Sequence, residues 1–174
     1  MSPEFDRRAF QDLSYGLYIV TSLEGDRLNG QIVNTVIQVT SDPAKVAVIV
    51  NKQNLTHSFI SKSRLFGVSV LDESTPMTFL GPFGFRSGRE VNKLSKVRFK
   101  IGFTGCPLVL EHSLAVLETN VIDEVDLGTH TIFVGDAVSA EVLKEGRPLT
   151  YRYYHEFLKG KVPPGAPTYN NAVK

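Results

Sequence analysis

The sequence predicts an all-β domain with peripheral helices, built on an antiparallel barrel or sandwich. Segments rich in Val, Ile, Thr and Phe with strand-like alternation dominate the chain. The connections between them are short and turn-like, at Glu24-Gly25-Asp26, Ser41-Asp42-Pro43 and Asp126-Leu127-Gly128. Such turns favour antiparallel pairing over helix-bridged crossovers. The predicted strands are Leu17–Ser22, Leu28–Thr40, Lys45–Asn51, Leu65–Leu71, Val97–Phe103, Ser113–Val125 and His130–Leu143.

Three helices are predicted around these strands. Ser2-Pro3-Glu4 supplies an N-cap, a proline at the first helical position and an early acid, and apolar residues then recur at helical spacing from Phe5 to Leu13. This pattern is typical of a short amphipathic helix. A second helix is predicted at Asn54–Ser63. Thr75-Pro76 can serve as the cap and first position of a third.

Two segments lack a regular pattern. Gly81–Asn92 interleaves three glycines and a proline with two phenylalanines and two arginines. Because glycine lets the backbone approach closely and arginine supplies charge or stacking, this loop can lie against a flat, anionic ligand. The alternative is a mobile surface loop. Gly160–Pro167 is proline-rich, and the chain from about residue 160 is predicted to be an extended tail.

The composition limits the class of protein. A chain of 174 residues has the size of one domain, which we predict to span residues 1–174. A net charge of +1, without a basic stripe, argues against a nucleic-acid partner. The single cysteine, Cys106, excludes an internal disulfide and suits a reducing compartment. No apolar stretch approaches the ~20 residues of a membrane helix. We therefore expect a soluble, cytoplasmic protein without a membrane partner.

The stretch from Val48 to Ile60 predicts an anion site. An apolar strand ends at Asn51-Lys52, and a helix starts near Asn54. The first turn of a helix offers unpaired N–H groups and the positive end of the helix dipole, which suits a phosphate monoester. The alternative is an ordinary capped helix with Asn54 as N-cap and Lys52 in solvent.

Other site chemistries have no specific support. The four histidines, His57, His112, His130 and His155, are widely separated and lack recognised metal-ligand spacing. Neither a Gly-x-Ser-x-Gly nucleophile elbow nor a G-x-G-x-x-G dinucleotide loop is present. We therefore predict no metal site and no catalytic side chain.

Polar residues interrupt the longest predicted apolar strand. Asn34, Thr35 and Gln38 fall within Leu28–Thr40, and buried amides and hydroxyls need hydrogen-bond partners. Either these side chains face solvent, or they meet the polar edge of a ring system.

These motifs, taken in order, resemble a known family. The order is F-x4-F-x5-G-x-Y-I-V-T-S, N-G-x3-N-T-x-x-Q-V, D-P, V-N-K-x-N-x-T-H-x-x-I, S-G-R-x3-K and G-x-H-T-x-F-V-G-D. It is similar to the FMN-binding split-barrel proteins of the flavin reductase-like family, and within them to flavoredoxin and the flavin domain of high-molecular-weight rubredoxin. The resemblance spans roughly residues 5 to 169.

The resemblance implies an antiparallel six-stranded Greek-key split β-barrel that forms a homodimer, with FMN near the subunit interface. It also assigns residues to the flavin by position. Those that would line the isoalloxazine ring are Asn29, Asn34, Thr35 and Val36. Those that would hold or flank the phosphate are Asn51, Lys52, Thr56 and His57. Those on the loop near the pyrimidine edge are Ser87, Arg89 and Lys93. His130 would border the nicotinamide side, and Tyr153 or Tyr154 would cover the ring.

The implied function is that of a flavoprotein oxidoreductase, which passes electrons from NAD(P)H or a protein donor through bound FMN to an acceptor such as rubredoxin. A cation near the pyrimidine edge would stabilise the anionic reduced flavin. Thr129 stands where the reductases have an aspartate before the histidine, which leaves NAD(P)H use open. Two alternatives remain: a free flavin reductase that supplies reduced flavin to an oxygenase, and a non-enzymatic FMN-binding protein.

Overall fold

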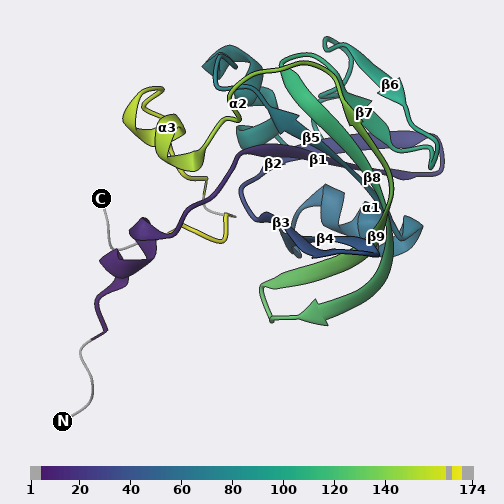
Figure 1. Ribbon diagram of the computed structural model, residues 1–174, viewed down its shortest axis with the longest axis horizontal. Coiled ribbons are helices and arrows are strands. Elements are labelled where there is room, and N and C mark those ends of the chain that lie inside the picture. The colour runs from purple at the N-terminus through teal and green to yellow at the C-terminus, as the bar shows by residue number, and fades with distance from the viewer. Residues whose placement is uncertain (1–4, 164–165, 170–174) are drawn as a thin grey trace.

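A curved antiparallel sheet of seven strands forms the body of the protein (Figure 1). The computed structural model describes residues 5–163 and 166–169. The strands hydrogen-bond in the order β2-β1-β5-β8-β9-β4-β3. Their bounds are β1 (Tyr18–Glu24), β2 (Arg27–Val33), β3 (Val36–Ser41), β4 (Ala44–Asn51), β5 (Leu65–Leu71), β8 (Ser113–Asp126) and β9 (His130–Val142). The predicted β-dominated, antiparallel class is confirmed, and the main sheet has seven strands where the family resemblance implied six.

The segment Leu28–Thr40, predicted as one strand, forms two. β2 and β3 lie at opposite edges of the hydrogen-bonded order, and Asn34-Thr35 connects them. Thr35 exchanges two backbone-directed hydrogen bonds with Ile49 of β4, since its hydroxyl donates to the Ile49 carbonyl and its own carbonyl accepts from the Ile49 N–H, each at 3.1 Å. The polar pair therefore carries the chain from one sheet edge to the other.

A small second sheet pairs β6 (Phe99–Ile101) with β7 (Pro107–Val109). The predicted strand Val97–Phe103 is thus shorter than expected, and β7 was not predicted. Its three residues are fully buried beside Cys106, too few to show a period in the sequence.

Helix α1 (Leu55–Ser63) confirms the prediction, with Asn54 as N-cap. Helix α2 (Met77–Phe85) starts one residue after Pro76 and continues into the glycine-rich segment, which was predicted to be irregular throughout. Helix α3 (Tyr151–Glu156) was not predicted, although the Thr150 side chain accepts a hydrogen bond from the Tyr153 N–H as an N-cap does.

The predicted N-terminal helix is wrong in type. A 3-10 helix, η1 (Arg7–Asp12), lies in its place, and the predicted cap Ser2-Pro3-Glu4 falls outside the described residues. Phe5, Phe10 and Leu13 are 71%, 55% and 52% exposed. Since most α-helical stability comes from burying an apolar face, an arm without that burial does not gain a regular helix.

Two hydrophobic clusters meet on the opposite faces of β1. Ile19 belongs to a cluster with Phe79, Leu80 and Phe83 of α2, and the next residue, Val20, belongs to a cluster enclosed by the curved sheet. Because successive strand residues point to opposite faces, β1 is buried on both sides. Helix α2 is thereby fixed against β1 and β2, and this position places the segment that follows it. No helix within the described part of the chain is long and apolar enough to cross a membrane.

Candidate functional site

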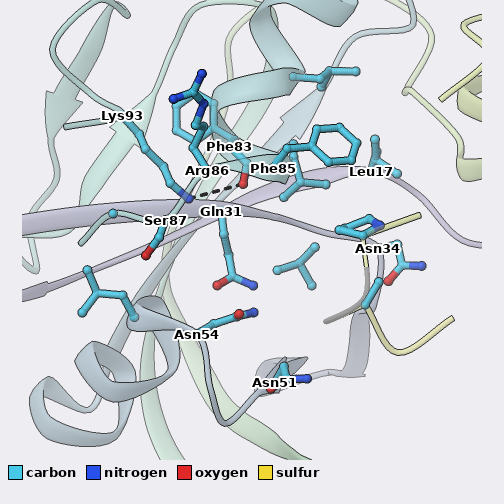
Figure 2. Close-up of a pocket in the computed structure, with 18 of the residues that line it drawn as sticks. Leu17, Gln31, Asn34, Asn51, Asn54, Phe83, Phe85, Arg86, Ser87 and Lys93 are labelled. Atoms are coloured by element: carbon cyan, nitrogen blue, oxygen red, sulfur yellow. Dashed lines mark hydrogen bonds between the residues drawn. The ribbon is translucent and has the colours of Figure 1, made fainter. Parts of the chain in front are cut away.

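A cavity of about 270 Å³ lies where β2, the β4–α1 turn, α2, α3 and the C-terminal segment meet (Figure 2). This volume is close to the lower end of the usual range for small-molecule sites, ~300–1,000 Å³. The lining residues that carry polar groups are Asn29, Gln31, Asn34, Asn51, Asn54, Arg86, Ser87, Arg89, Lys93, Tyr151, Tyr154 and Lys161. Leu17, Leu80, Phe83 and Phe85 supply apolar surface.

The β2 wall of the cavity is held against both α1 and the glycine-rich loop. Asn29 is 4% exposed, and its Nδ2 donates to Thr56 Oγ1 of α1 at 2.8 Å. On its other side, a Cβ added to Gly88 would lie 2.1 Å from Asn29 Oδ1. The loop therefore reaches Asn29 only because residue 88 has no side chain. Gln31 lies two residues further along β2, so its amide leaves the same face of the strand.

The N-terminus of α1 forms part of the opposite wall. Asn54 and Leu55 both line the cavity, and the Asn54 side chain makes no capping hydrogen bond. Figure 2 shows the Asn54 side chain on the cavity side, near Gln31. The first backbone N–H groups of this nine-residue helix, together with its dipole, favour an anion here.

Positive charge dominates the lining. Four cationic side chains, those of Arg86, Arg89, Lys93 and Lys161, border the cavity, and no Asp or Glu does so among its described residues. Arg89 also joins the two walls, because its guanidinium donates to the Gln53 carbonyl of the β4–α1 turn at 3.2 Å. This electrostatic arrangement suits a ligand with more than one negative charge.

Lys93 is the most buried of these cations, at 8% exposed. Its Nζ donates a long hydrogen bond of 3.4 Å to the Phe83 carbonyl, shown as the dashed line in Figure 2. Burial lowers the pKa of Lys93 from 10.5 to about 8, because desolvation penalises the charged form. The ammonium form still predominates at pH 7, so the cavity holds a buried positive charge without a carboxylate beside it.

Two tyrosines of α3 and the C-terminal segment close one side. The Tyr151 hydroxyl shares a 2.7 Å hydrogen bond with Thr168 Oγ1, which also accepts from Asn34 Nδ2 at 3.1 Å. Tyr154 donates to the Lys161 carbonyl at 2.9 Å. Burial raises the pKa of both tyrosines, so they remain neutral phenols. Of the two candidates Tyr153 and Tyr154, the structure places Tyr154 in the lining, while Tyr153 stacks on Phe157.

Half of the predicted site residues converge on this cavity. Asn29, Asn34, Asn51, Ser87, Arg89 and Lys93 line it. Thr35 and Val36 do not, because Thr35 bonds to Ile49 and Val36 packs against the core of the sheet. Thr56 is fully buried behind Asn29 and contributes through that side chain.

Lys52, His57 and His130 lie outside the lining as well. Lys52 forms a 2.6 Å ion pair with Asp126 of the β8–β9 hairpin. His57 shares a 2.8 Å hydrogen bond with Thr131, and burial lowers the pKa of its imidazole. His130 Nδ1 and Thr129 Oγ1 are 2.9 Å apart. These three residues therefore gather around the turn of the β8–β9 hairpin, and none of them lines the cavity.

Four polar contributors were missed from the sequence, and one of them, Lys161, lies in the segment that was predicted to be an extended tail. Gln31 has a detectable signal, because it alternates with Asn29 on the same strand. Arg86 belongs to the glycine-rich segment that was already singled out. Tyr151 has no such signal, since α3 itself was not predicted. No group of three potential metal ligands occurs within residues 5–163 and 166–169.

Comparisons with known proteins show the family to which the chain belongs. Residues 10–157 match the flavin reductase like domain. The chain is 48% identical over 164 residues to the high molecular weight rubredoxin of Moorella thermoacetica, covering 94% of this chain and 72% of that protein. It is 54% identical over 164 residues to the ferric-chelate reductase (NAD(P)H) of Archaeoglobus fulgidus, covering 94% of this chain and 97% of that protein.

Among solved structures, the Streptomyces globisporus C-1027 NADH:FAD oxidoreductase SgcE6 superposes with a TM-score of 0.76 at 25% identity, covering 86% of this chain and 93% of that one. The buried Lys93, the α1 N-terminus and the amide-lined β2 wall fit a ring system that carries a phosphate. The chain therefore belongs to the flavin reductase-like domain family, and it is a flavin-dependent oxidoreductase.

Proposed function

We propose that the cavity binds FMN, with its ring between β2 and the glycine-rich loop and its phosphate at the N-terminus of α1. The observation that carries this proposal is the charge balance of the lining, where a buried lysine and the first turn of α1 lack an acidic partner. FMN brings negative charge to both places, since its phosphate is anionic and its reduced ring is anionic too.

Bound FMN supplies the electron chemistry, and the chain's own residues orient the ring and set its electrostatic surroundings. Asn29 and Gln31 offer amide donors and acceptors from one wall, and Lys93 places a cation on the other. Tyr151 and Tyr154 exclude water from the side that α3 covers. None of these groups has to gain or lose a proton for the ligand to be held.

The electron donor and acceptor are proposed by similarity. One relative is a ferric-chelate reductase named for NAD(P)H, and another is a high molecular weight rubredoxin. We propose NAD(P)H or a protein donor as the source of electrons and a redox protein such as rubredoxin as the acceptor. Cys106 is the single cysteine, so a four-thiolate iron centre would belong to another chain or domain.

A visible absorbance spectrum of the purified protein tests the proposal. We expect flavin bands that bleach when NADH or NADPH is added without oxygen and return when oxidised rubredoxin follows. The matched control is Gly88→Val, in which the loop cannot approach Asn29. A wild-type protein that stays colourless after incubation with FMN would contradict the proposal.

A free flavin reductase is the second candidate, favoured by the similarity to an NADH:FAD oxidoreductase. The two functions differ in how long the flavin stays bound. Flavin that remains through gel filtration supports a carrier, whereas apoprotein that reduces added flavin with saturable kinetics supports a reductase. An FMN-bound protein that no nicotinamide or redox protein reduces would instead support the non-enzymatic alternative.

We further propose a cytoplasmic homodimer in which a second copy covers the outer face of β3, β4 and the distal hairpin. Ile37, Val39 and Val125 are 62%, 46% and 46% exposed on this part of the sheet. Val125 pairs with Ile132, which pairs with Ile49 of the cavity lining, so the apolar face continues to the flavin site. Apolar faces of this kind mark interaction surfaces. Light scattering on the wild type and on Ile37→Asp tests it, with a dimer and a monomer expected; two monomers would refute it.

A further inference from the structure

Lys93 holds a position that ordinary packing does not explain. The residue is 8% exposed, and its amine donates to a backbone carbonyl at 3.4 Å, which is long for a charged donor. Buried lysines in folded proteins are normally paired, because an isolated buried ammonium is costly. Other lysines of this chain follow that rule: Lys45 is partly buried on β4 and forms a 2.6 Å ion pair with Asp136.

The charged and titratable side chains that border the cavity with Lys93 come from the glycine-rich loop, α3 and the C-terminal segment. The β2 and α1 side chains in the lining are uncharged amides, and the glycine-rich loop brings the guanidinium groups of Arg86 and Arg89. From α3 come Tyr151 and Tyr154, whose pKa values burial raises. The remaining cation, Lys161 of the C-terminal segment, is exposed to solvent. We therefore expect Lys93 to be the cation whose charge changes in response to an anionic ligand.

We propose that Lys93 is a redox-linked proton-binding residue, which takes up a proton when the bound flavin is reduced and releases it when the flavin is oxidised. This inference rests on the proposed binding of FMN. It assigns to the buried amine the role of compensating the negative charge that reduction creates, because Lys93 is the most buried cation of the described lining.

The number of protons taken up on reduction follows from the balance of charge. Two electrons from a reduced nicotinamide, or from dithionite in a titration, enter oxidised FMN with one proton on the ring and leave one negative charge. A second proton from solvent binds the neutral Lys93 amine and compensates that charge. The couple then carries two protons for two electrons, and reoxidation returns both protons to solvent.

The pH range follows from the burial of the amine. With neutral, oxidised flavin beside it, Lys93 stays desolvated, and its pKa lies near the value of about 8 that burial alone produces. An anionic reduced flavin favours the ammonium and raises that pKa. Below about pH 8 the lysine is charged in both redox states, so reduction adds only the ring proton. Above about pH 8 reduction adds a second proton, until the pKa of the reduced state is reached.

The test is the midpoint potential of the FMN-loaded protein against pH, measured with indicator dyes from about pH 6 to about pH 9.5. For the wild type, we expect the slope to double above about pH 8. For Lys93→Met, we expect a single slope throughout. The ratio of affinities for reduced and oxidised FMN at pH 7 should also fall at least about tenfold, which equals about 30 mV for a two-electron couple.

Two further variants separate charge from titration. Lys93→Arg keeps a cation at every pH, so it should retain the affinity ratio and lose the change of slope. Lys45→Met removes a partly buried lysine that already has its carboxylate, so it should leave both unchanged. Isotope-labelled lysine NMR gives a direct readout, because the Lys93 resonance should titrate at a higher pH in the reduced protein than in the oxidised one.

The outcomes distinguish this inference from the function on which it rests. If FMN binds and Lys93→Met keeps the wild-type change of slope, Lys93 is not the proton-binding group and the flavoprotein assignment stands. A Lys93 resonance that titrates at the same pH in both redox states overturns the inference in the same way. If the wild type binds no FMN, the proposed function itself fails.

Discussion

Two lysines that the sequence assigns to one ligand lie in contrasting environments. Lys52, on the β4–α1 turn, is exposed and forms an ion pair with Asp126 at 2.6 Å. Lys93, after α2, is 8% exposed and reaches only a carbonyl, at 3.4 Å, in a cavity bordered by no acid among its described residues. A surface ion pair is screened by water and already satisfied, whereas a buried ammonium without a carboxylate is available for an anion. From this difference we expect the ligand-binding lysine to be the one that is buried and lacks a competing acid, whatever its position in the motif.

The largest loss of FMN affinity should come from disturbing the glycine-rich loop, which approaches β2 at Gly88. In Gly88→Val, the new side chain would overlap Asn29 Oδ1, which is 2.1 Å from the Cβ position, so the loop has to move away. We expect FMN affinity to fall about thousandfold, roughly 4 kcal/mol, in a fluorescence titration. Gly81→Ala in α2 is the control, because no atom lies within 4 Å of its Cβ position. Equal affinities for the two variants would show that the close approach is dispensable.

Lys93 should also govern the stability of the flavin-free protein. Its pKa is lowered from 10.5 in the unfolded chain to about 8 in the folded one, so the folded state binds fewer protons between these values. Stability should therefore rise as pH increases from about 8 to about 10.5. Lys93→Met removes the buried charge and should be more stable than wild type at pH 7 by up to about 3 kcal/mol.

Urea unfolding of the two flavin-free proteins across this pH range measures the difference. We expect it to shrink towards high pH, where the wild-type amine is neutral in both states. Saturating FMN should also reduce it, because the ligand stabilises the folded wild type. A flat difference across pH would mean that Lys93 is better hydrated than its burial indicates.

The same substitution at each of the two lysines should give a smaller effect on the affinity for reduced FMN. Lys52→Met should change the affinity for reduced FMN by less than about threefold, since its charge is exposed and paired. Lys93→Met should weaken the same affinity at least about tenfold. Anaerobic titration of both variants checks the contrast. A larger loss for Lys52→Met would place the phosphate at the turn of the β8–β9 hairpin instead, beside His57 and His130.

The smallest expected effect concerns the C-terminal side of the cavity. Thr168→Val removes the hydroxyl that joins Tyr151 to Asn34. A hydrogen bond of this kind contributes about 1 kcal/mol, so FMN should bind about fivefold more weakly. Tyr151→Phe removes one of the two bonds and should give an intermediate value. No change in either variant would show that this segment does not help to form the site.

The extent to which the sequence predicted the structure depended on the range of the interactions involved. Alternation identified Leu65–Leu71 with its bounds, and the strand-to-helix pattern identified α1, because both signals are local. The connection between β2 and β3 at Asn34-Thr35 could not be predicted, because the segments on both sides are strands. Hydrogen bonds between Thr35 and Ile49 of β4 fix this connection. The N-terminal helix failed for a related reason, since its apolar side chains Phe5, Phe10 and Leu13 remain mostly exposed and gain little from a regular helix.

The predicted site residues also fall into two groups, those that meet in the cavity and those that distant segments hold elsewhere. Asn29, Ser87, Arg89 and Lys93 were predicted from motif positions and do meet in the cavity, because β2 and the loop are fixed by α2. Lys52 and His57 come from the same helix-start motif, yet the hairpin, more than 60 residues away, supplies Asp126 and Thr131 and holds them elsewhere. Sequence patterns indicate which residues suit a ligand, while competing partners from distant strands decide which remain available.

The hydrogen bond between the Arg89 guanidinium and the Gln53 carbonyl joins the glycine-rich loop to the β4–α1 turn. Its donor is exposed, so water can replace it without leaving a buried group unpaired. Two walls of the cavity are therefore linked by a contact that costs little to break. Since related complexes differ in affinity mainly through their dissociation rates, we expect this contact to act on the residence time of the flavin, which separates a tightly held redox carrier from a shuttle that releases its flavin.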